Sequence, residues 1–241
     1  MTNWILDILF PKKCIGCKKE GSYYCQSCIS NILQADLVCP RCEGLAVGGQ
    51  THPICRKKFG LDGLWSLGVY AGPLKTAIQK LKYEPSLVKD FAPVLMDITI
   101  EYWAKYQPFI LDLIKKDQGR GWVVVPVPLH WFKENKRGFN QSALIGQLLS
   151  NNLGLSYCEA LKRTRYTKSQ VGLKEKDRKG NIKNAFTLNT THPSFGGKYL
   201  IHNTNVLLID DVWTTGSTLR ECCYFLKRAG AKKVWAITLA R

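Results

Sequence analysis

The sequence is short of acidic residues: 18 Asp and Glu stand against 35 Lys and Arg, which gives a formal net charge of +17 over 241 residues. This excess favours polyanionic partners, either nucleic acid or phosphorylated metabolites. No apolar run approaches the roughly 18 residues of a membrane helix, so no membrane span is expected. The first ten residues carry an acid and lack a basic start, which argues against a signal peptide. These absences predict a cytoplasmic protein.

Cysteine is scarce outside one segment, because seven of the ten cysteines fall within residues 14–55. Most of them form Cys-x-x-Cys pairs, and His52 and Cys55 repeat the same spacing with an imidazole. Two intervening residues let a tight turn direct both side chains at one metal ion, so repeated pairs favour tetrahedral zinc. Eight ligands are enough for two structural sites, on which so small a segment would depend to fold.

Pairing the ligands by sequence neighbours gives two sets of four. An interleaved pairing stays open, and a disulfide framework is disfavoured because nothing indicates secretion. We expect a zinc-binding module over residues 1–60 and a second domain over residues 61–241. The first set is Cys14, Cys17, Cys25 and Cys28, and the second is Cys39, Cys42, His52 and Cys55.

A ligand-binding pattern stands near the end of the chain. Residues 206–209 are four consecutive aliphatic residues, typical of a strand buried on both faces of a parallel sheet. Asp210 and Asp211 follow, at the end of the strand where open α/β sheets bind ligands. A turn rich in hydroxyls and glycine then opens an apolar helical run, and a helix N-terminus attracts phosphate. Acids followed by a phosphate cradle suit a ribose 5-phosphate, whereas a solvated turn with a helix N-cap is the simpler alternative.

Further elements predict an α/β fold around this pattern. Apolar, β-prone runs predict strands at residues 64–70, 122–128 and 232–239, and apolar periodicity predicts helices at 74–81, 86–105 and 140–153. The second strand ends in prolines, and the basic loop after it carries Lys133, Lys136 and Arg137. Guanidinium binds phosphate oxygens in bidentate fashion, so this loop is a candidate seat for a pyrophosphate.

Residues 162–183 form a strongly basic segment, with nine Lys or Arg against two acids. We expect a mobile, solvated loop. Such a loop could close over a ligand and exclude water, or bind single-stranded nucleic acid by stacking a base on its tyrosine. The candidate residues are Arg163, Arg165, Tyr166, Lys168, Gln170 and Arg178.

The string from Ile209 to Thr218 resembles the phosphoribosyl pyrophosphate (PRPP) motif of type I phosphoribosyltransferases, and its Ile-Asp-Asp-Val-x-Thr-Thr-Gly form resembles the ComF family. Pro-Val-Pro-Leu from Pro126 and Arg-Gly-Phe-Asn-Gln from Arg137 are also similar to that family. The resemblance implies a parallel-sheet, Rossmann-like phosphoribosyltransferase domain after a double zinc ribbon. His52 stands where the family more often has cysteine, and Trp213 is bulkier than the usual residue.

The resemblance also assigns roles and cofactors. PRPP would bind with Mg²⁺, while Zn²⁺ would be structural. Asp210 and Asp211 would hold the ribose and stabilise the cation formed in catalysis. The 5-phosphate would bind Thr214, Thr215, Gly216, Ser217 and Thr218, and the pyrophosphate would bind Val127, Pro128, Lys136 and Arg137.

Three functions follow from these assignments. The first is phosphoribosyl transfer to an acceptor that the sequence does not identify, in the service of DNA uptake during natural competence. The second is a non-catalytic protein that binds single-stranded DNA for the uptake machinery, with PRPP as its regulator. The third, a zinc-dependent DNA binder without a ligand site, leaves the PRPP motif unexplained.

Overall fold

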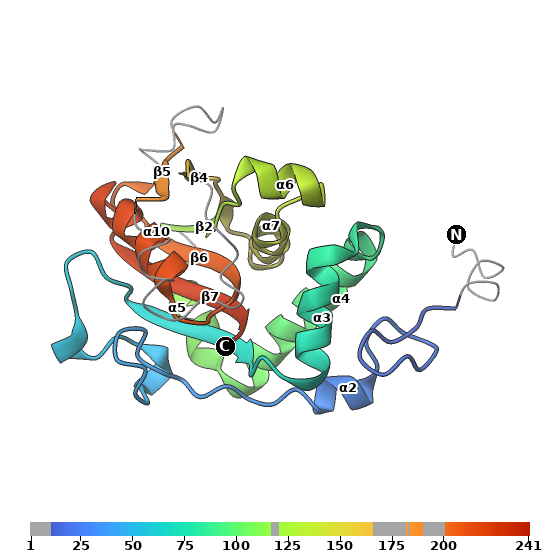
Figure 1. Cartoon of the computed structure of the whole chain (residues 1–241). Coiled ribbons are helices and arrows are strands. Elements are labelled where there is room, and N and C mark those ends of the chain that lie inside the picture. Colours follow the sequence, from blue (N-terminus) through green and yellow to red (C-terminus); the bar gives the residue numbers. More distant parts are fainter. Residues whose placement is uncertain (1–10, 117–120, 166–181, 183, 190–200) are drawn as a thin grey trace.

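A five-stranded, wholly parallel sheet forms the centre of the computed structural model, which describes residues 11–116, 121–165, 182, 184–189 and 201–241 (Figure 1). The strand order is β1-β7-β6-β2-β3. The predicted parallel α/β fold is therefore confirmed. The strands are β1 (Gly63–Gly68), β2 (Trp122–Pro126), β3 (Ser156–Tyr157), β6 (Asn205–Val212) and β7 (Lys233–Ala240).

Strand β6 lies in the middle of the sheet, between β2 and β7, and its aliphatic run is buried on both faces. Leu207 and Ile209 belong to one hydrophobic core, whereas Val206 and Leu208 belong to the core on the opposite face. Successive side chains of a strand point to opposite faces, so an uninterrupted apolar run is what a sheet covered on both sides requires.

Helices cover the two faces unequally (Figure 1). The first core takes residues from α3, α4, α5 and α7, and the second takes residues from α10 and from a two-stranded antiparallel hairpin. The helices are α3 (Gly72–Tyr83), α4 (Pro85–Tyr106), α5 (Pro108–Lys116), α7 (Gln141–Leu153) and α10 (Ser217–Arg228), and the hairpin is β4 (Leu161–Arg163) with β5 (Phe186–Leu188).

One local expectation was wrong, and a second was wrong at its first residues, since residues 166–181 and 183 of the expected loop lie outside the described residues. The basic loop after β2 is mostly a helix, α6 (Trp131–Arg137), which begins where the His130 side chain accepts from the Phe132 N–H and ends at Gly138 with φ 81°. The basic segment expected as a loop opens with strand β4, in which Leu161 and Arg163 are buried and Lys162 is exposed. The Arg163 guanidinium lies over the Phe186 ring at 5.3 Å, and this packing makes an arginine acceptable on the inner face of a strand.

The N-terminal segment, residues 11–60, has little regular structure. It contains α2 (Gln26–Ser30) and the 3₁₀ turns η1 (Val47–Gly49) and η2 (Pro53–Cys55). It lies along β1, the edge strand of the sheet (Figure 1). Gln50 forms an antiparallel bridge with Gly63, and the Val69 N–H donates to the Leu33 carbonyl at 2.8 Å. The Tyr24 ring packs against Phe91 of α4, with ring centroids 5.9 Å apart. Among the described residues, no helix is long and apolar enough to cross a membrane.

Candidate functional site

A polar cavity of about 230 Å³ opens where β2 and β6 end. Open parallel sheets bind their ligands at this edge, beyond the carboxyl ends of the strands. Its lining combines an acid pair, four cationic side chains and a turn at a helix N-terminus. Of the predicted ligand residues, the lining includes Val127, Arg137, Asp210, Asp211, Thr214, Gly216, Ser217 and Thr218.

The acid pair is held by helix α7 and by a lysine from α3. Ser142 Oγ donates to Asp210 Oδ1 at 3.2 Å, and Gln141 Nε2 donates to Asp211 Oδ2 at 2.8 Å. Lys82 Nζ lies 3.0 Å from the same Asp211 oxygen. Asp211 is 8% exposed, so its charge needs these partners.

The surroundings of Asp210 change how readily its carboxyl group ionises. Burial, and then the negative charge of Asp211, raises the pKa of Asp210 to about 7. Burial alone would lower the pKa of Lys82, but the adjacent Asp211 carboxylate outweighs it and raises that pKa. The site therefore carries one carboxyl group that changes charge near neutral pH.

The turn before α10 has the form of an anion cradle. Gly216 adopts a left-handed conformation with φ 66°, directly before the first residue of the helix. A Cβ on Gly216 would lie 2.3 Å from the Trp213 ring. Glycine is therefore required both for the left-handed backbone and for lack of space. Thr215 Oγ1 and Ser217 Oγ lie 2.9 Å apart and share a hydrogen bond. Thr214, Ser217 and Thr218, at the N-terminal end of α10, then line the same cavity as the acids.

Three cations line the opposite part of the cavity: Lys133, Arg137 and Arg163. Lys133 and Arg137 stand one turn apart on α6 and therefore share a face of the helix. Burial, and then the charges of Arg163 and Arg137, lowers the pKa of Lys133 to about 8. These positive charges repel one another in a half-buried place. A bound polyanion such as pyrophosphate would relieve this repulsion.

The remaining predicted ligands lie elsewhere. Lys136 is exposed on α6 and is not part of the lining. Pro128 lines an adjacent cavity of about 250 Å³. Thr215 supports the turn through its contacts without lining the cavity. Arg165 is exposed next to β4, while Tyr166, Lys168, Gln170 and Arg178 lie outside the described residues.

Sequence reasoning missed four polar lining residues: Lys82, Tyr83, Gln141 and Ser142. Gln141 closes the Arg-Gly-Phe-Asn-Gln string, and its Oε1 accepts from Arg137 Nη1 at 3.1 Å. The position of this string at the start of a helix could have drawn attention to it. Lys82 has no local signal, since its partner Asp211 is far away in the sequence.

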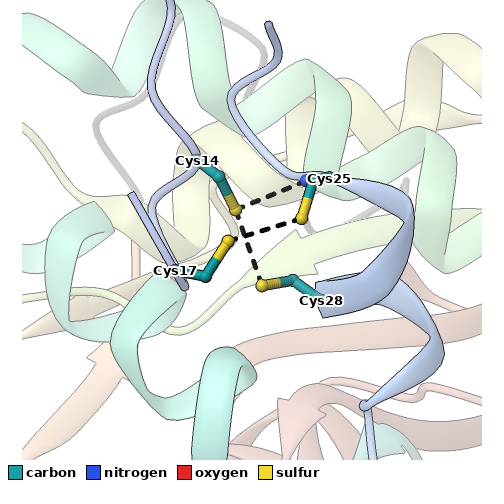
Figure 2. A group of neighbouring side chains, drawn as sticks. All are labelled: Cys14, Cys17, Cys25 and Cys28. Carbon is teal, nitrogen blue, oxygen red and sulfur yellow. Dashed lines mark hydrogen bonds between the residues drawn. The ribbon is translucent and has the colours of Figure 1, made fainter. Parts of the chain in front are cut away.

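The first cysteine set forms a compact group in which all four side chains point toward one another (Figure 2). The Cys14 and Cys28 sulfurs are 3.5 Å apart, as are those of Cys17 and Cys25. Ligands at about 2.3 Å from a tetrahedral zinc place sulfurs about 3.8 Å apart, so this group fits the ion. Burial works to raise the pKa of the Cys14 thiol, but N–H donors such as that of Cys25, 3.4 Å away, lower it to about 6.

In the second set a histidine lies close to three cysteines, as predicted by pairing ligands that are neighbours in the sequence. The ligand atoms of Cys39, Cys42, His52 and Cys55 all lie within 4.8 Å of one another. Cys42 Sγ lies 3.4 Å from His52 Nδ1, and His52 Nε2 lies 2.9 Å from the Leu45 carbonyl oxygen. A backbone carbonyl on the far ring nitrogen orients Nδ1 toward a metal. Both groups are therefore able to hold zinc ions.

Comparison with protein families defines the class of this protein. The family model described as phosphoribosyl transferase domain matches residues 141–241, which carry the acid pair and the turn before α10. Together with the parallel sheet, this match identifies an α/β protein with a phosphoribosyltransferase domain.

Curated relatives then identify the family. The chain is 29% identical to competence protein F of Haemophilus influenzae over 238 residues, 95% of this chain and 90% of the relative. It is 30% identical to DNA utilization protein YhgH of Escherichia coli K12 over 226 residues, 90% of this chain and 89% of the relative. Competence protein ComFC of Streptococcus pneumoniae is 29% identical over 137 residues, 56% of this chain and 54% of the relative. The chain belongs to the ComF family.

Proposed function

We propose that the cavity at the ends of β2 and β6 binds PRPP with Mg²⁺. The observation that carries this proposal is the meeting of three complementary groups around one cavity. The turn from Thr214 to Thr218 would take the 5-phosphate, and Asp210 with Asp211 would accept from the ribose hydroxyls. Arg137 and its neighbouring cations would take the pyrophosphate.

The same arrangement supports phosphoribosyl transfer. Departure of pyrophosphate leaves positive charge on the ribose, and the acid pair is placed to stabilise it. Holding the two ends of the substrate fixes the reacting carbon, which is the larger part of such catalysis. Mg²⁺ would contribute charge neutralisation at the pyrophosphate, with most of its ligands coming from the substrate and water.

Titration calorimetry with Mg-PRPP tests the binding site. The zinc-loaded wild type should bind, and the double variant Asp210→Asn, Asp211→Asn should lose binding at least about a hundredfold, since two charged hydrogen bonds are removed. Asp112→Asn, an exposed carboxylate on α5, is the matched control. Absence of binding by the wild type would refute the proposal.

A second function, binding of single-stranded DNA, is favoured by a larger cavity of about 770 Å³ between the N-terminal segment and α10. Its lining carries Arg41, Lys57, Lys58 and Arg220 together with the rings of Phe59 and Tyr224. The two rings meet edge to face at 5.5 Å. Cations that follow a phosphate backbone, interleaved with rings on which bases stack, are the usual means of binding single strands.

The relatives are called competence and DNA utilization proteins, which supports a role of this chain in DNA uptake. Such a role requires no turnover at the PRPP cavity, which would then act as a regulatory site. Metal-binding thiolates persist in a reducing compartment, and this supports a cytoplasmic location. The metal-dependent module would be residues 1–60 and the ligand-binding domain residues 61–241.

Salt dependence distinguishes the two functions. Binding of an oligothymidylate should weaken steeply between 50 and about 200 mM salt, because each phosphate contact releases a counterion. Lys57→Gln with Lys58→Gln should lower the slope, whereas Lys115→Gln with Lys116→Gln, an exposed pair on α5, should not. An oligonucleotide affinity that is the same in both double variants would exclude this cavity as the DNA site.

A further inference from the structure

Arg220 joins the phosphate turn to the N-terminal segment. It stands in the first turns of α10 with its side chain 29% exposed. Its Nη1 donates to the Thr215 carbonyl oxygen at 2.6 Å, and its Nε and Nη2 donate to the Pro40 carbonyl oxygen at 3.0 and 2.7 Å. One rigid guanidinium thus spans two backbone segments that lie far apart in the sequence.

Pro40 lies in the turn that carries two ligand residues of the second metal-binding group. It lies between Cys39 and Cys42, in a turn closed by the Glu43 N–H donating to the Cys39 carbonyl at 2.9 Å. Glu43 Oε1 also lies 3.4 Å from Arg220 Nη2. The position of the Pro40 carbonyl therefore depends on a turn whose two cysteines are metal ligands, and such turns form only when the ion is bound.

On its other side Arg220 fixes the phosphate turn at two points. It holds the Thr215 carbonyl, and its guanidinium carbon lies 5.0 Å from the centre of the Trp213 ring. The same ring occupies the space next to Gly216 that a Cβ would need. Arg220 thereby sets the backbone on both sides of Gly216, and so the conformation of a turn whose residues Thr214, Gly216, Ser217 and Thr218 line the cavity.

We infer that Arg220 is a positioning residue through which the second metal site sets the conformation of the phosphate turn. Its effect on ligand affinity rests on the proposed PRPP function, while its effect on the turn does not. Filling the Cys39, Cys42, His52 and Cys55 site organises the turn for phosphate. Because linkage is reciprocal, phosphate bound at the turn raises the zinc affinity of this site by the same factor.

Hydrogen exchange of the ligand-free protein tests the coupling directly. Arg220→Gln should speed exchange of the amides of residues 213–219 by about tenfold or more while both metal sites stay filled, as native mass spectrometry would show. Cys42→Ser, which removes a ligand of the second site, should do the same. Arg220→Lys should fall between, because one ammonium does not reach both carbonyls in the same geometry.

Two controls separate coupling from general loosening. Arg228→Gln changes an arginine at the end of the same helix that contacts Tyr224, and should leave the turn unchanged. Cys17→Ser empties the first metal site and should also leave the turn protected. Equal acceleration in Cys17→Ser, or none in Arg220→Gln, would overturn the inference.

Titration with Mg-PRPP supplies the second readout. Arg220→Gln should bind about tenfold more weakly than the wild type, and Mg-PRPP should raise the zinc affinity of the second site in the wild type only. If the wild type does not bind Mg-PRPP, the proposed function fails, and the exchange data still decide the coupling. If binding is unchanged in Arg220→Gln, the coupling does not reach the ligand and the inference fails.

Discussion

Lys82 Nζ lies 3.0 Å from Asp211 Oδ2, which ties the end of α3 to the acid pair at the end of β6. Both side chains are largely buried, with 20% and 11% of their surfaces exposed. Removing one member of such a pair leaves an uncompensated charge. The ion pair therefore holds the Lys82 charge beside the acid pair, in which burial raises the pKa of Asp210 to about 7.

Ligand affinity should rise with pH through neutrality. The raised pKa of Asp210, about 7, means that the group is mostly protonated at pH 6 and mostly ionised at pH 8. If the ionised form accepts from the ribose, Mg-PRPP affinity should increase up to about tenfold over this range. Calorimetry at several pH values measures it. Asp210→Asn should lose this increase, apart from the part due to the ligand's own phosphates.

The same shift should destabilise the ligand-free protein at higher pH. A carboxyl group whose pKa is higher in the folded than in the unfolded state holds its proton longer when folded. The free energy of unfolding therefore falls as pH rises from about 4 to 7. At pH 7.5 Asp210→Asn should be more stable than the wild type by on the order of 1 kcal/mol, measured by urea denaturation. A less stable variant would contradict this.

Lys82→Met should move the pH profile of ligand binding to higher pH. The Lys82 charge is among the causes that lower the pKa of Asp210, so its removal raises that pKa further. The midpoint of the affinity profile should shift upward by about one pH unit. Lys80→Met is the control, because Lys80 lies on the same helix and pairs with Glu84. A profile equally shifted in the control would point to a general charge effect.

Gly216→Ala should abolish phosphate binding. The new Cβ would meet the Trp213 ring and hold a side chain at φ 66°, so the turn must change shape. A left-handed residue other than glycine costs about 1–2 kcal/mol, and the displaced N–H groups should weaken Mg-PRPP binding by about a hundredfold. Gly154→Ala is a matched control, since Gly154 has φ 64° but open space around it. It should cost stability without changing affinity.

Chelation of zinc should unfold the N-terminal segment and leave the sheet intact. Within the described residues this segment holds only one short helix and two single turns, so the metal groups replace a core. Limited trypsin digestion should then cut after Lys18, Lys19, Arg41 or Lys57, all exposed, and spare a fragment containing β1 to β7. Equal resistance with and without chelator would exclude a structural role for the metal.

Local patterns predicted the parts of the fold that have a local cause. The aliphatic run before Asp210 is typical of a strand buried on both faces. Helix α7 begins at Gln141 with Asn140 as its cap, and the cap and the apolar positions are adjacent in sequence. Ligand spacing predicted both metal groups in the same way. These features need no knowledge of distant residues.

The rest depended on contacts that only the folded chain creates. Residues 131–137 are too polar for apolar periodicity to predict a helix. Arg163 is tolerated in β4 because its guanidinium packs on the Phe186 ring. Lys82 enters the site through its pairing with Asp211, and Arg220 supports the turn beside the site through contacts with Thr215 and Pro40. Except for Arg220 and Thr215, the two residues of each of these contacts are far apart in the sequence, so no local sequence pattern includes both of them.

The bridge between Gln50 and Gly63 has a consequence for solubility. β1 is an outer strand of the sheet, and its open side is shielded by the N-terminal segment at Gln50 and again at Leu33. An uncovered outer strand offers unpaired backbone groups to other copies of the chain and invites aggregation. The N-terminal segment thus shields an edge of the sheet from self-association, and if metal holds this segment in place, removal of the metal should promote aggregation.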